Sequence, residues 1–202
     1  MISTPKQVKP TGLQSFKADE VILFPGEPSS LYRLKNGLIR IHTVDDDGNG
    51  LTLRYVKPGG FFGEEALLKH QRKYFAEAIT FCEVEILSPM KLSSSESQQV
   101  LEHLAAAVEG LYLALHRLSG KRLKSRIAAE LLELQDSALA NLSKEGKPVV
   151  RMTHDALAAA VGSVRETVTK VVGELAKEGA ISAGYGKISL LNLELLRKIA
   201  DE

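Results

Sequence analysis

The sequence predicts an α+β protein: an N-terminal antiparallel β-roll of the jelly-roll kind, a long helix, and a C-terminal winged helix-turn-helix. Three observations predict this fold class. Short β-rich runs separated by turn residues fill the first half, a heptad-like row of apolar residues follows, and two short helical patterns with a hairpin come last. We expect the three parts to span residues 1–95, 96–120 and 121–202.

The composition is that of an ordinary globular protein. Hydrophobic residues make up 44% and charged residues 25% of the 202 residues, which excludes a disordered or fibrous chain. The net charge of +1 provides no global basic field, so any argument for nucleic acid must come from local geometry. One cysteine, Cys82, excludes a disulfide framework, a Cys-based zinc site and an iron–sulfur cluster, and is expected to be a small core residue.

The chain offers no signal for a membrane or for export. No apolar run approaches the roughly 18–20 residues that span a bilayer, and the first residues lack the apolar core of a signal peptide. We therefore expect a cytoplasmic protein with no membrane partner.

The first part consists of short strands bounded by turn residues. Pro25-Gly26 ends one apolar run, and Asn36-Gly37, between two others, is typical of a two-residue β-hairpin. Six to eight antiparallel strands of this kind favour a barrel or jelly roll. The runs lie at 21–24, 31–35, 38–44, 51–56 and within 77–87.

The second part is a helix with a narrow apolar stripe. Its residues alternate at spacings of three and four, as in an a/d seam, and are Leu101, Leu104, Val108, Leu111, Leu115 and Leu118. A helix packed on its own domain would also be apolar here, but it would show a wider face, so the stripe favours a homodimer. The seam stops at 119–122, where we expect a hinge, and a further helix follows from Arg122 to about Asp136.

The third part contains a short helix, a tight turn and a second helix. Thr153 is the expected N-cap of the first helix, and Gly162 is expected at positive φ in the turn. Ser163 is expected to begin the second helix, with Glu166 completing a capping box. The first helix is expected to bury Leu157, Ala160 and Val161, and the second Val164, Val168, Val171 or Val172, and Leu175.

This arrangement leaves polar side chains outward at the start of the second helix. Arg165 can bond guanine and Glu166 can accept from cytosine, whereas Thr153 and Thr167 suit phosphate contacts. An ordinary helical hairpin with a solvated charged face is the alternative, but the segment 181–190 reads as a β-wing and favours double-stranded DNA as the partner. The candidate DNA-contacting residues are Arg165, Glu166, Lys170, Thr169, Thr153, Thr167, Ser163 and Lys187.

Three motifs carry a family resemblance: Val-Gly-Ser-Val-Arg-Glu-Thr-Val at 161–168, Ile181-Ser182 in the wing, and Gly-Phe-Phe-Gly-Glu at 60–64. Over nearly its whole length the chain resembles the cyclic-AMP receptor protein and fumarate-nitrate regulator (Crp/Fnr) family of bacterial transcription factors. The resemblance implies a cyclic-nucleotide-binding-type β-roll, a dimerising helix and base contacts to a TGTGA-like half-site by Arg165, Glu166 and Lys170. Many members have Arg where this chain has Lys170, and Lys lacks the planar fork that reads guanine.

The resemblance also implies an effector site, which this chain matches only in part. Gly63-Glu64 match the pair that holds phosphate and ribose in cyclic-AMP-binding members, and Arg72 aligns with their arginine. Lys73 stands where a serine is expected, and Leu111 and Tyr112 stand where Thr-Ser would meet adenine. We interpret the pocket as vestigial, with Glu64 and Arg72 paired to each other and no cofactor. A small anion at Arg72 and Lys73, or cyclic AMP, remains the alternative.

Other classes of site or function find less support. Haem would need an axial ligand, but a lone histidine is usually packed or solvated; the candidates are His42, His70, His103 and His116. A metal-dependent cupin enzyme would need clustered histidines, and no Gly-x-Ser-x-Gly or P-loop occurs. A purely cyclic-nucleotide-binding regulatory subunit would not need the wing or the Arg165-Glu166 face.

We therefore expect a homodimeric, sequence-specific transcriptional regulator, an activator that contacts RNA polymerase and binds DNA without a nucleotide effector. The seam would set two recognition helices about one DNA turn apart. The alternative is the same regulator dependent on a small anionic effector or a cyclic nucleotide.

Overall fold

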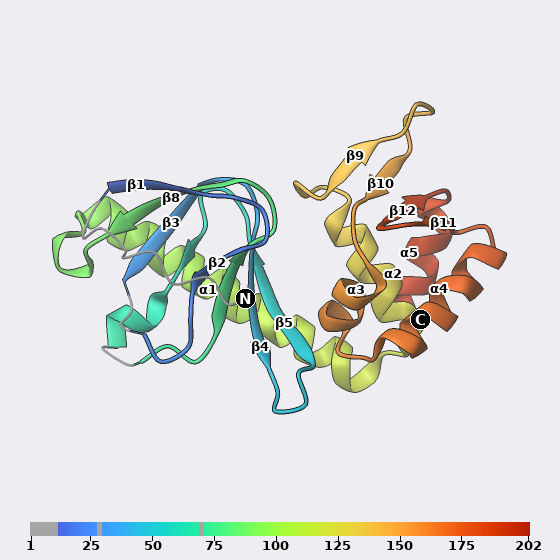
Figure 1. Ribbon diagram of the computed structural model, residues 1–202, viewed down its shortest axis with the longest axis horizontal. Helices are drawn as coiled ribbons and strands as arrows, with labels where there is room; N and C mark the ends of the chain where they lie inside the picture. The colour runs from blue at the N-terminus through green and yellow to red at the C-terminus, as the bar shows by residue number, and fades with distance from the viewer. Residues whose placement is uncertain (1–11, 28–29, 69–70) are drawn as a thin grey trace. The chain divides into compact units, whose positions relative to one another are not determined.

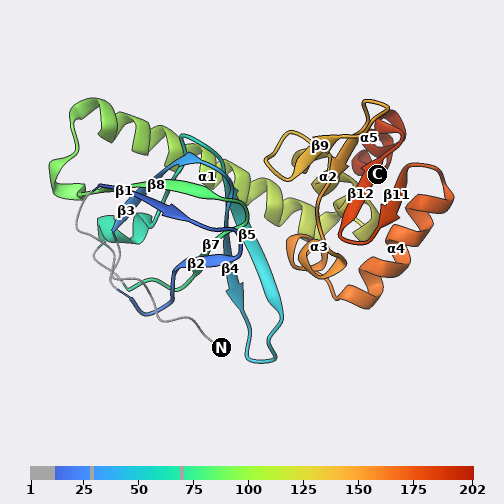
Figure 2. The same cartoon turned by 45° about the horizontal axis from the view of Figure 1, so that its top comes forward.

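The computed structural model describes residues 12–27, 30–68 and 71–202. Their chain divides into two compact units. The first contains the described residues up to Thr43 together with Leu53–Gly110, and the second contains Val44–Thr52 and Leu111–Glu202. Figures 1 and 2 show the strands of the first unit and the helices and short strands of the second. None of the described helices is long and apolar enough to cross a membrane.

The first unit is built around two four-stranded sheets, which confirms the predicted β-roll. Their strand orders are β1-β8-β3-β6 and β2-β7-β4-β5, and β8 pairs antiparallel with both β1 and β3. Side chains that alternate inward from both sheets form one buried cluster, which includes Leu34, Ile39, Phe62 and Val84. The strands are β1 Gly12–Phe16, β2 Glu20–Leu23, β3 Leu31–Asn36, β4 Ile39–Val44, β5 Gly50–Val56, β6 Phe61–Phe62, β7 Phe75–Ala78 and β8 Cys82–Leu87, with short 3-10 helices η1 Glu64–Leu68 and η2 Pro89–Lys91.

The predicted hairpin at Asn36-Gly37 is wrong. β3 pairs with β8 and β6, whereas β4 lies in the other sheet beside β7 and β5, so the turn passes the chain from one sheet to the other. Gly37 has φ 97°, and a Cβ there would lie 2.3 Å from the carbonyl oxygen of Phe81 and 2.6 Å from Sγ of Cys82. The glycine is needed for this crossing, because no side chain fits against the start of β8.

The long helix α1 spans Ser94–Gly120 and begins on the β-roll. Val100 forms a buried cluster with Leu31 and Phe61, and Leu104 packs against the same cluster. Leu104 is thus partly buried by its own β-roll and is not free to pack only against a second copy of the helix. The other seam positions are all exposed, with exposed fractions from 41% at Leu118 to 65% at Leu115; they are Leu101, Val108, Leu111, Leu115 and Leu118.

The second unit contains the predicted winged helix-turn-helix and two elements that were not predicted from the sequence. Its helices are α2 Leu123–Leu134, α3 His154–Val161, α4 Arg165–Lys177 and α5 Leu193–Asp201. The strands β9 Ala140–Leu142, β10 Pro148–Val150, β11 Ile181–Gly184 and β12 Lys187–Leu190 form one sheet in the order β11-β12-β10-β9.

The missed elements are the β9–β10 hairpin and α5. The polar run 143–148 lies largely in the turn between β9 and β10, where Gly146 has φ 75°. Each strand has three residues, too few to show a period of two. Helix α5 is capped by the Asn192 side chain, which accepts from the Leu195 N–H, and it packs on α2.

Candidate functional site

The turn between α3 and α4 is set by two local signals. The Thr153 hydroxyl accepts a hydrogen bond from the Ala156 N–H at 3.1 Å, which confirms it as the N-cap of α3. Gly162 is left-handed, with φ 61° and ψ 54°, and the Ser163 N–H donates back to the Ala158 carbonyl at 3.0 Å. The buried residues of α3 are Leu157, Ala158 and Val161; Ala160, expected inward, is only partly buried.

Helix α4 begins later than predicted. The turn uses Gly162 and Ser163, so the N-cap is Val164, in extended conformation and with no side-chain cap. The predicted capping box between Ser163 and Glu166 is therefore wrong. Val164 is 52% exposed and does not belong to the buried stripe, which consists of Val168, Val172 and Leu175.

Opposite that stripe, the start of α4 presents a polar face, which we call the recognition face and define as Arg165, Glu166, Thr169 and Lys170. All four residues are exposed, while Val168 between them is fully buried. Thr153, Thr167 and Lys187 are also exposed, and Ser163 is partly buried. The arrangement suits insertion of the helix into a major groove, with hydrogen-bonding groups outward and the apolar side held by the domain.

Two contacts tie the start of α3 to this face. Nη1 of Arg165 lies 3.3 Å from Oδ2 of Asp155, and Nδ1 of His154 lies 3.0 Å from Oγ1 of Thr169. Neither α3 residue was among the DNA-contacting residues predicted from the sequence. Their position directly after the Thr153 N-cap could have indicated them, since the tight turn brings the first turn of α3 beside that of α4.

The β11–β12 hairpin lies beside the start of α3. The Met152 N–H donates to the Gly186 carbonyl at 3.0 Å, which places the hairpin turn next to the residue before Thr153. Tyr185 in that turn is wholly exposed, and Lys187 is exposed at the start of β12. The turn of the wing thus lies beside the start of the helix pair.

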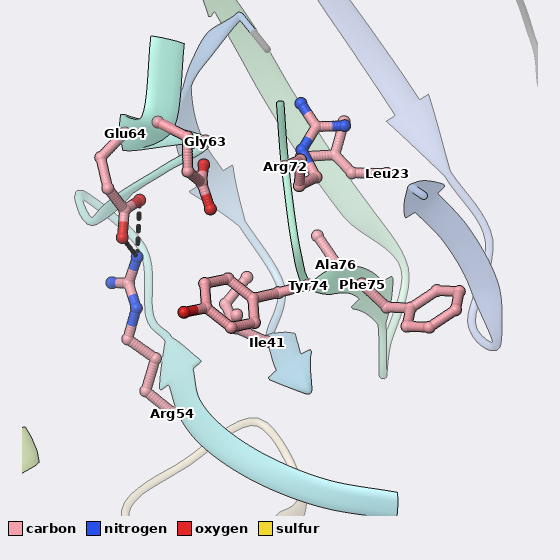
Figure 3. Close-up of a pocket in the computed structure, with 10 residues that line it drawn as sticks. Leu23, Ile41, Arg54, Gly63, Glu64, Arg72, Tyr74, Phe75 and Ala76 are labelled. Atoms are coloured by element: carbon pink, nitrogen blue, oxygen red, sulfur yellow. Dashed lines mark hydrogen bonds and ion pairs between the residues drawn. The ribbon is translucent and has the colours of Figure 1, made fainter. Parts of the chain in front are cut away.

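A small pocket lies in the β-roll at the predicted effector site (Figure 3). It is lined by Leu23, Ile41, Arg54, Gly63, Glu64, Glu65, Arg72, Tyr74, Phe75 and Ala76. The cavity volume is about 10 Å³, which is roughly the space that one water molecule needs. The pocket as it stands is too small for a nucleotide.

Arg54 occupies the position next to Glu64. Its guanidinium donates to both carboxylate oxygens of Glu64, at 2.7 and 2.8 Å, and Figure 3 shows the two side chains pointing toward each other. Nη1 of Arg54 also lies 3.0 Å from Nε2 of His103 on α1. Burial, with the Arg54 charge second, lowers the pKa of His103, which favours the neutral ring that can accept a hydrogen bond from the guanidinium.

The predicted pairing of Glu64 with Arg72 is wrong. Arg72 is 4% exposed, lies on the opposite side of the pocket from Glu64, and its Nη1 is 3.8 Å from Oε2 of Glu27. Lys73 is exposed and does not line the pocket. Arg54 could have been noticed from the strand pattern, since it shares a face with Val56, and a cation on an inward face needs a partner.

The predicted adenine-contact positions Leu111 and Tyr112 are exposed, at 45% and 69%. They belong to the second unit, whereas every residue that lines the pocket belongs to the first.

The cysteine and the histidines that were considered as metal or haem ligands differ in their exposure to solvent. Cys82 is fully buried, as predicted, and burial raises its thiol pKa. His42 is buried and stacks on Phe75 with 5.1 Å between ring centroids, which leaves it little access to a ligand. His116 is exposed, and His70 lies outside the described residues. No group of three or more potential metal ligands occurs in the described part of the chain.

Comparison with known proteins agrees with this architecture. Residues 13–94 match the family model of the cyclic nucleotide-binding domain, and residues 125–199 match that of the Crp-like helix-turn-helix domain. The chain is 53% identical over 190 residues to the transcriptional regulator SdrP of Thermus thermophilus, covering 93% of each chain. It is 36% identical over 189 residues to the transcriptional regulator LdrP of the same organism, covering 93% of this chain and 96% of LdrP.

The fold of this chain also matches that of a solved structure. A crystal structure of a CRP/FNR-family transcriptional regulator from Thermus thermophilus matches with a TM-score of 0.90 and 52% identity, over 95% of this chain and 99% of the other. These relatives are transcriptional regulators and not enzymes. With its β-roll, long helix and winged helix-turn-helix, this chain belongs to the Crp/Fnr family of transcriptional regulators.

Proposed function

We propose that the chain acts as a homodimer that binds a TGTGA-like palindrome. The exposed recognition face of α4 is the observation that carries the proposal. Arg165 supplies a planar fork for guanine O6 and N7, Glu166 accepts from cytosine N4, and Lys170 adds a cation. Thr153, Thr167, Thr169, Ser163 and Lys187 supply hydroxyls and a charge for further contacts, chiefly to phosphate.

The proposed dimer forms through the exposed seam of α1. Five of its six apolar residues are more than 40% exposed in the single chain, and they recur at a/d spacing from Leu101 to Leu118. A row of exposed apolar side chains on one helix face is unfavourable in water and is covered when two such helices pack together. Two-fold symmetry then repeats the recognition face about one turn of DNA away, which matches a palindrome.

We propose further that DNA binding needs no cyclic nucleotide. In the β-roll the Glu64 carboxylate is already bonded by Arg54, and the cavity has room for about one water. A nucleotide would have to break the ion pair and open the pocket before it could bind. We propose that the regulator acts as an activator through surface contacts with RNA polymerase, in the cytoplasm where the chromosome lies.

Fluorescence anisotropy on labelled duplexes tests the proposal. The purified protein is titrated onto a TGTGA-N6-TCACA duplex and onto a scrambled duplex, at one stated salt concentration, with and without cyclic AMP. We expect specific binding of equal strength in both conditions. Specific binding only with cyclic AMP would overturn effector independence. Equal binding to both duplexes would overturn the palindrome.

A further inference from the structure

Asp155 contacts the recognition face without belonging to it. It lies in the first turn of α3, and its Oδ2 is 3.3 Å from Nη1 of Arg165, the first residue of α4. Both side chains are more than 60% exposed. An ion pair this exposed contributes little to folding stability. The fold of the helix pair instead rests on buried residues such as Leu157 and Val168, so the contact is available for another role.

The second contact between the helices restricts where Asp155 can lie. Nδ1 of His154 is 3.0 Å from Oγ1 of Thr169, one turn further along α4 than Arg165. Asp155 follows His154 directly, and the backbone before it is held by the Thr153 cap. The first turn of α3 is therefore held in place at Thr153 and at His154, and this fixes the backbone that carries the Asp155 carboxylate.

We infer that Asp155 is a positioning residue for base recognition, holding the Arg165 guanidinium in the orientation that reads guanine; this inference rests on the proposed function of Arg165. A guanidinium has five N–H donors, so one edge can bond the carboxylate while the others face the groove. The carboxylate also competes with DNA phosphates for the same side chain. Arg165 is thereby kept from bonding the backbone of any sequence, and discrimination increases at the base pair it reads.

Base-resolved binding of the full-length protein tests this role. Anisotropy is measured on the palindrome and on duplexes with one base pair changed in both half-sites, for the wild type, Arg165→Ala, Asp155→Asn and Asp155→Glu. Asp136→Asn, in the exposed turn after α2, is the matched control, because it removes the same charge elsewhere in the domain. Thermal unfolding of each variant measures any loss of stability separately.

We expect Arg165→Ala to abolish discrimination at one base pair. Asp155→Asn should reduce discrimination at that same base pair by about 2- to 10-fold, with binding to scrambled DNA unchanged or tighter. Asp155→Glu should restore part of the loss, and Asp136→Asn should leave the profile unchanged. In the Arg165→Ala background, Asp155→Asn should have no further effect on discrimination.

A uniform loss of affinity in Asp155→Asn on all duplexes, or a change at a different base pair, would overturn the inference. The proposed function would still stand if Arg165→Ala abolishes discrimination at one base pair only. If Arg165→Ala itself lowers binding equally on every duplex, the proposed base contact fails, and the role of Asp155 fails with it.

Discussion

Arg54 on β5 and Glu64 at the start of η1 form an ion pair inside the β-roll, in which Nη2 of Arg54 lies 2.7 and 2.8 Å from the two carboxylate oxygens of Glu64. Their side chains are 15% and 32% exposed, so water screens the pair only in part. The third partner, His103, lies on α1. One guanidinium thus connects a strand, the short helix of the pocket and the long helix, at the place where the family resemblance implies a ligand.

Removal of the two partners of this ion pair should have non-additive effects on stability. Arg54→Met leaves the Glu64 carboxylate partly buried without its partner, and we expect a loss of about 1–3 kcal/mol in the free energy of unfolding. The double variant Arg54→Met with Glu64→Gln should be destabilised by less than the sum of the single changes. Urea unfolding measures the three values, and additive effects would show that the two groups are not coupled.

The seam of α1 should tolerate no charge. We expect Leu111→Lys to give a monomer that binds the palindrome poorly, because it places an ammonium between two apolar helix faces. Leu113→Lys is the matched control, since Leu113 lies on the same helix, is 57% exposed and stands outside the a/d row. Sedimentation equilibrium distinguishes the two variants, and a Leu111→Lys dimer of unchanged strength would refute the seam.

Glu130 should make the second unit less stable as pH rises. Burial, helped by the Glu133 carboxylate and opposed by Arg117, raises the pKa of Glu130 from 4.5 to about 7. Between these pH values the unfolded chain has released a proton that the folded chain still holds, so ionisation favours unfolding. This loss of stability begins near pH 4.5 and is complete above pH 7.

Replacement of Glu130 by Gln removes that pH dependence. The stability of Glu130→Gln relative to the wild type should increase between pH 4.5 and 8, by on the order of 1–3 kcal/mol. Urea unfolding at several pH values measures this difference. Glu145→Gln, in the exposed β9–β10 turn, should show no such trend. A difference that stays constant with pH in Glu130→Gln would contradict the raised pKa.

Gly37 should be irreplaceable at the crossing between the two sheets. Gly37→Ala combines a φ of 97° with a Cβ 2.3 Å from the Phe81 carbonyl oxygen, and we expect a loss of about 2–4 kcal/mol in the free energy of unfolding. Gly110→Ala meets no atom within 4 Å on the exposed side of α1, and should gain about 0.5–1 kcal/mol from its better helix propensity. Thermal unfolding of both variants gives the comparison; a Gly37→Ala protein as stable as the wild type would show that the turn can rearrange.

The amino-acid sequence by itself determined the local features of this protein. Thr153 and Gly162 bound α3 as predicted because an N-cap and a left-handed turn depend on neighbours within a few residues. Apolar β-rich runs bounded by turn residues likewise identified most strands of the β-roll. Helical periodicity predicted the buried positions Val168 and Leu175, and left Val171 or Val172 as the one between them, which is Val172.

Tertiary structure alone decided the relationships between distant residues. Period and turn propensity cannot tell which strand lies beside β3, and so Asn36-Gly37 was predicted as a hairpin although it connects two sheets. The partner of Glu64 is Arg54 rather than Arg72 because the β-roll places β5, and not the segment after η1, against that carboxylate. Such contacts depend on how elements pack in space, which the spacing of residues along one chain does not specify.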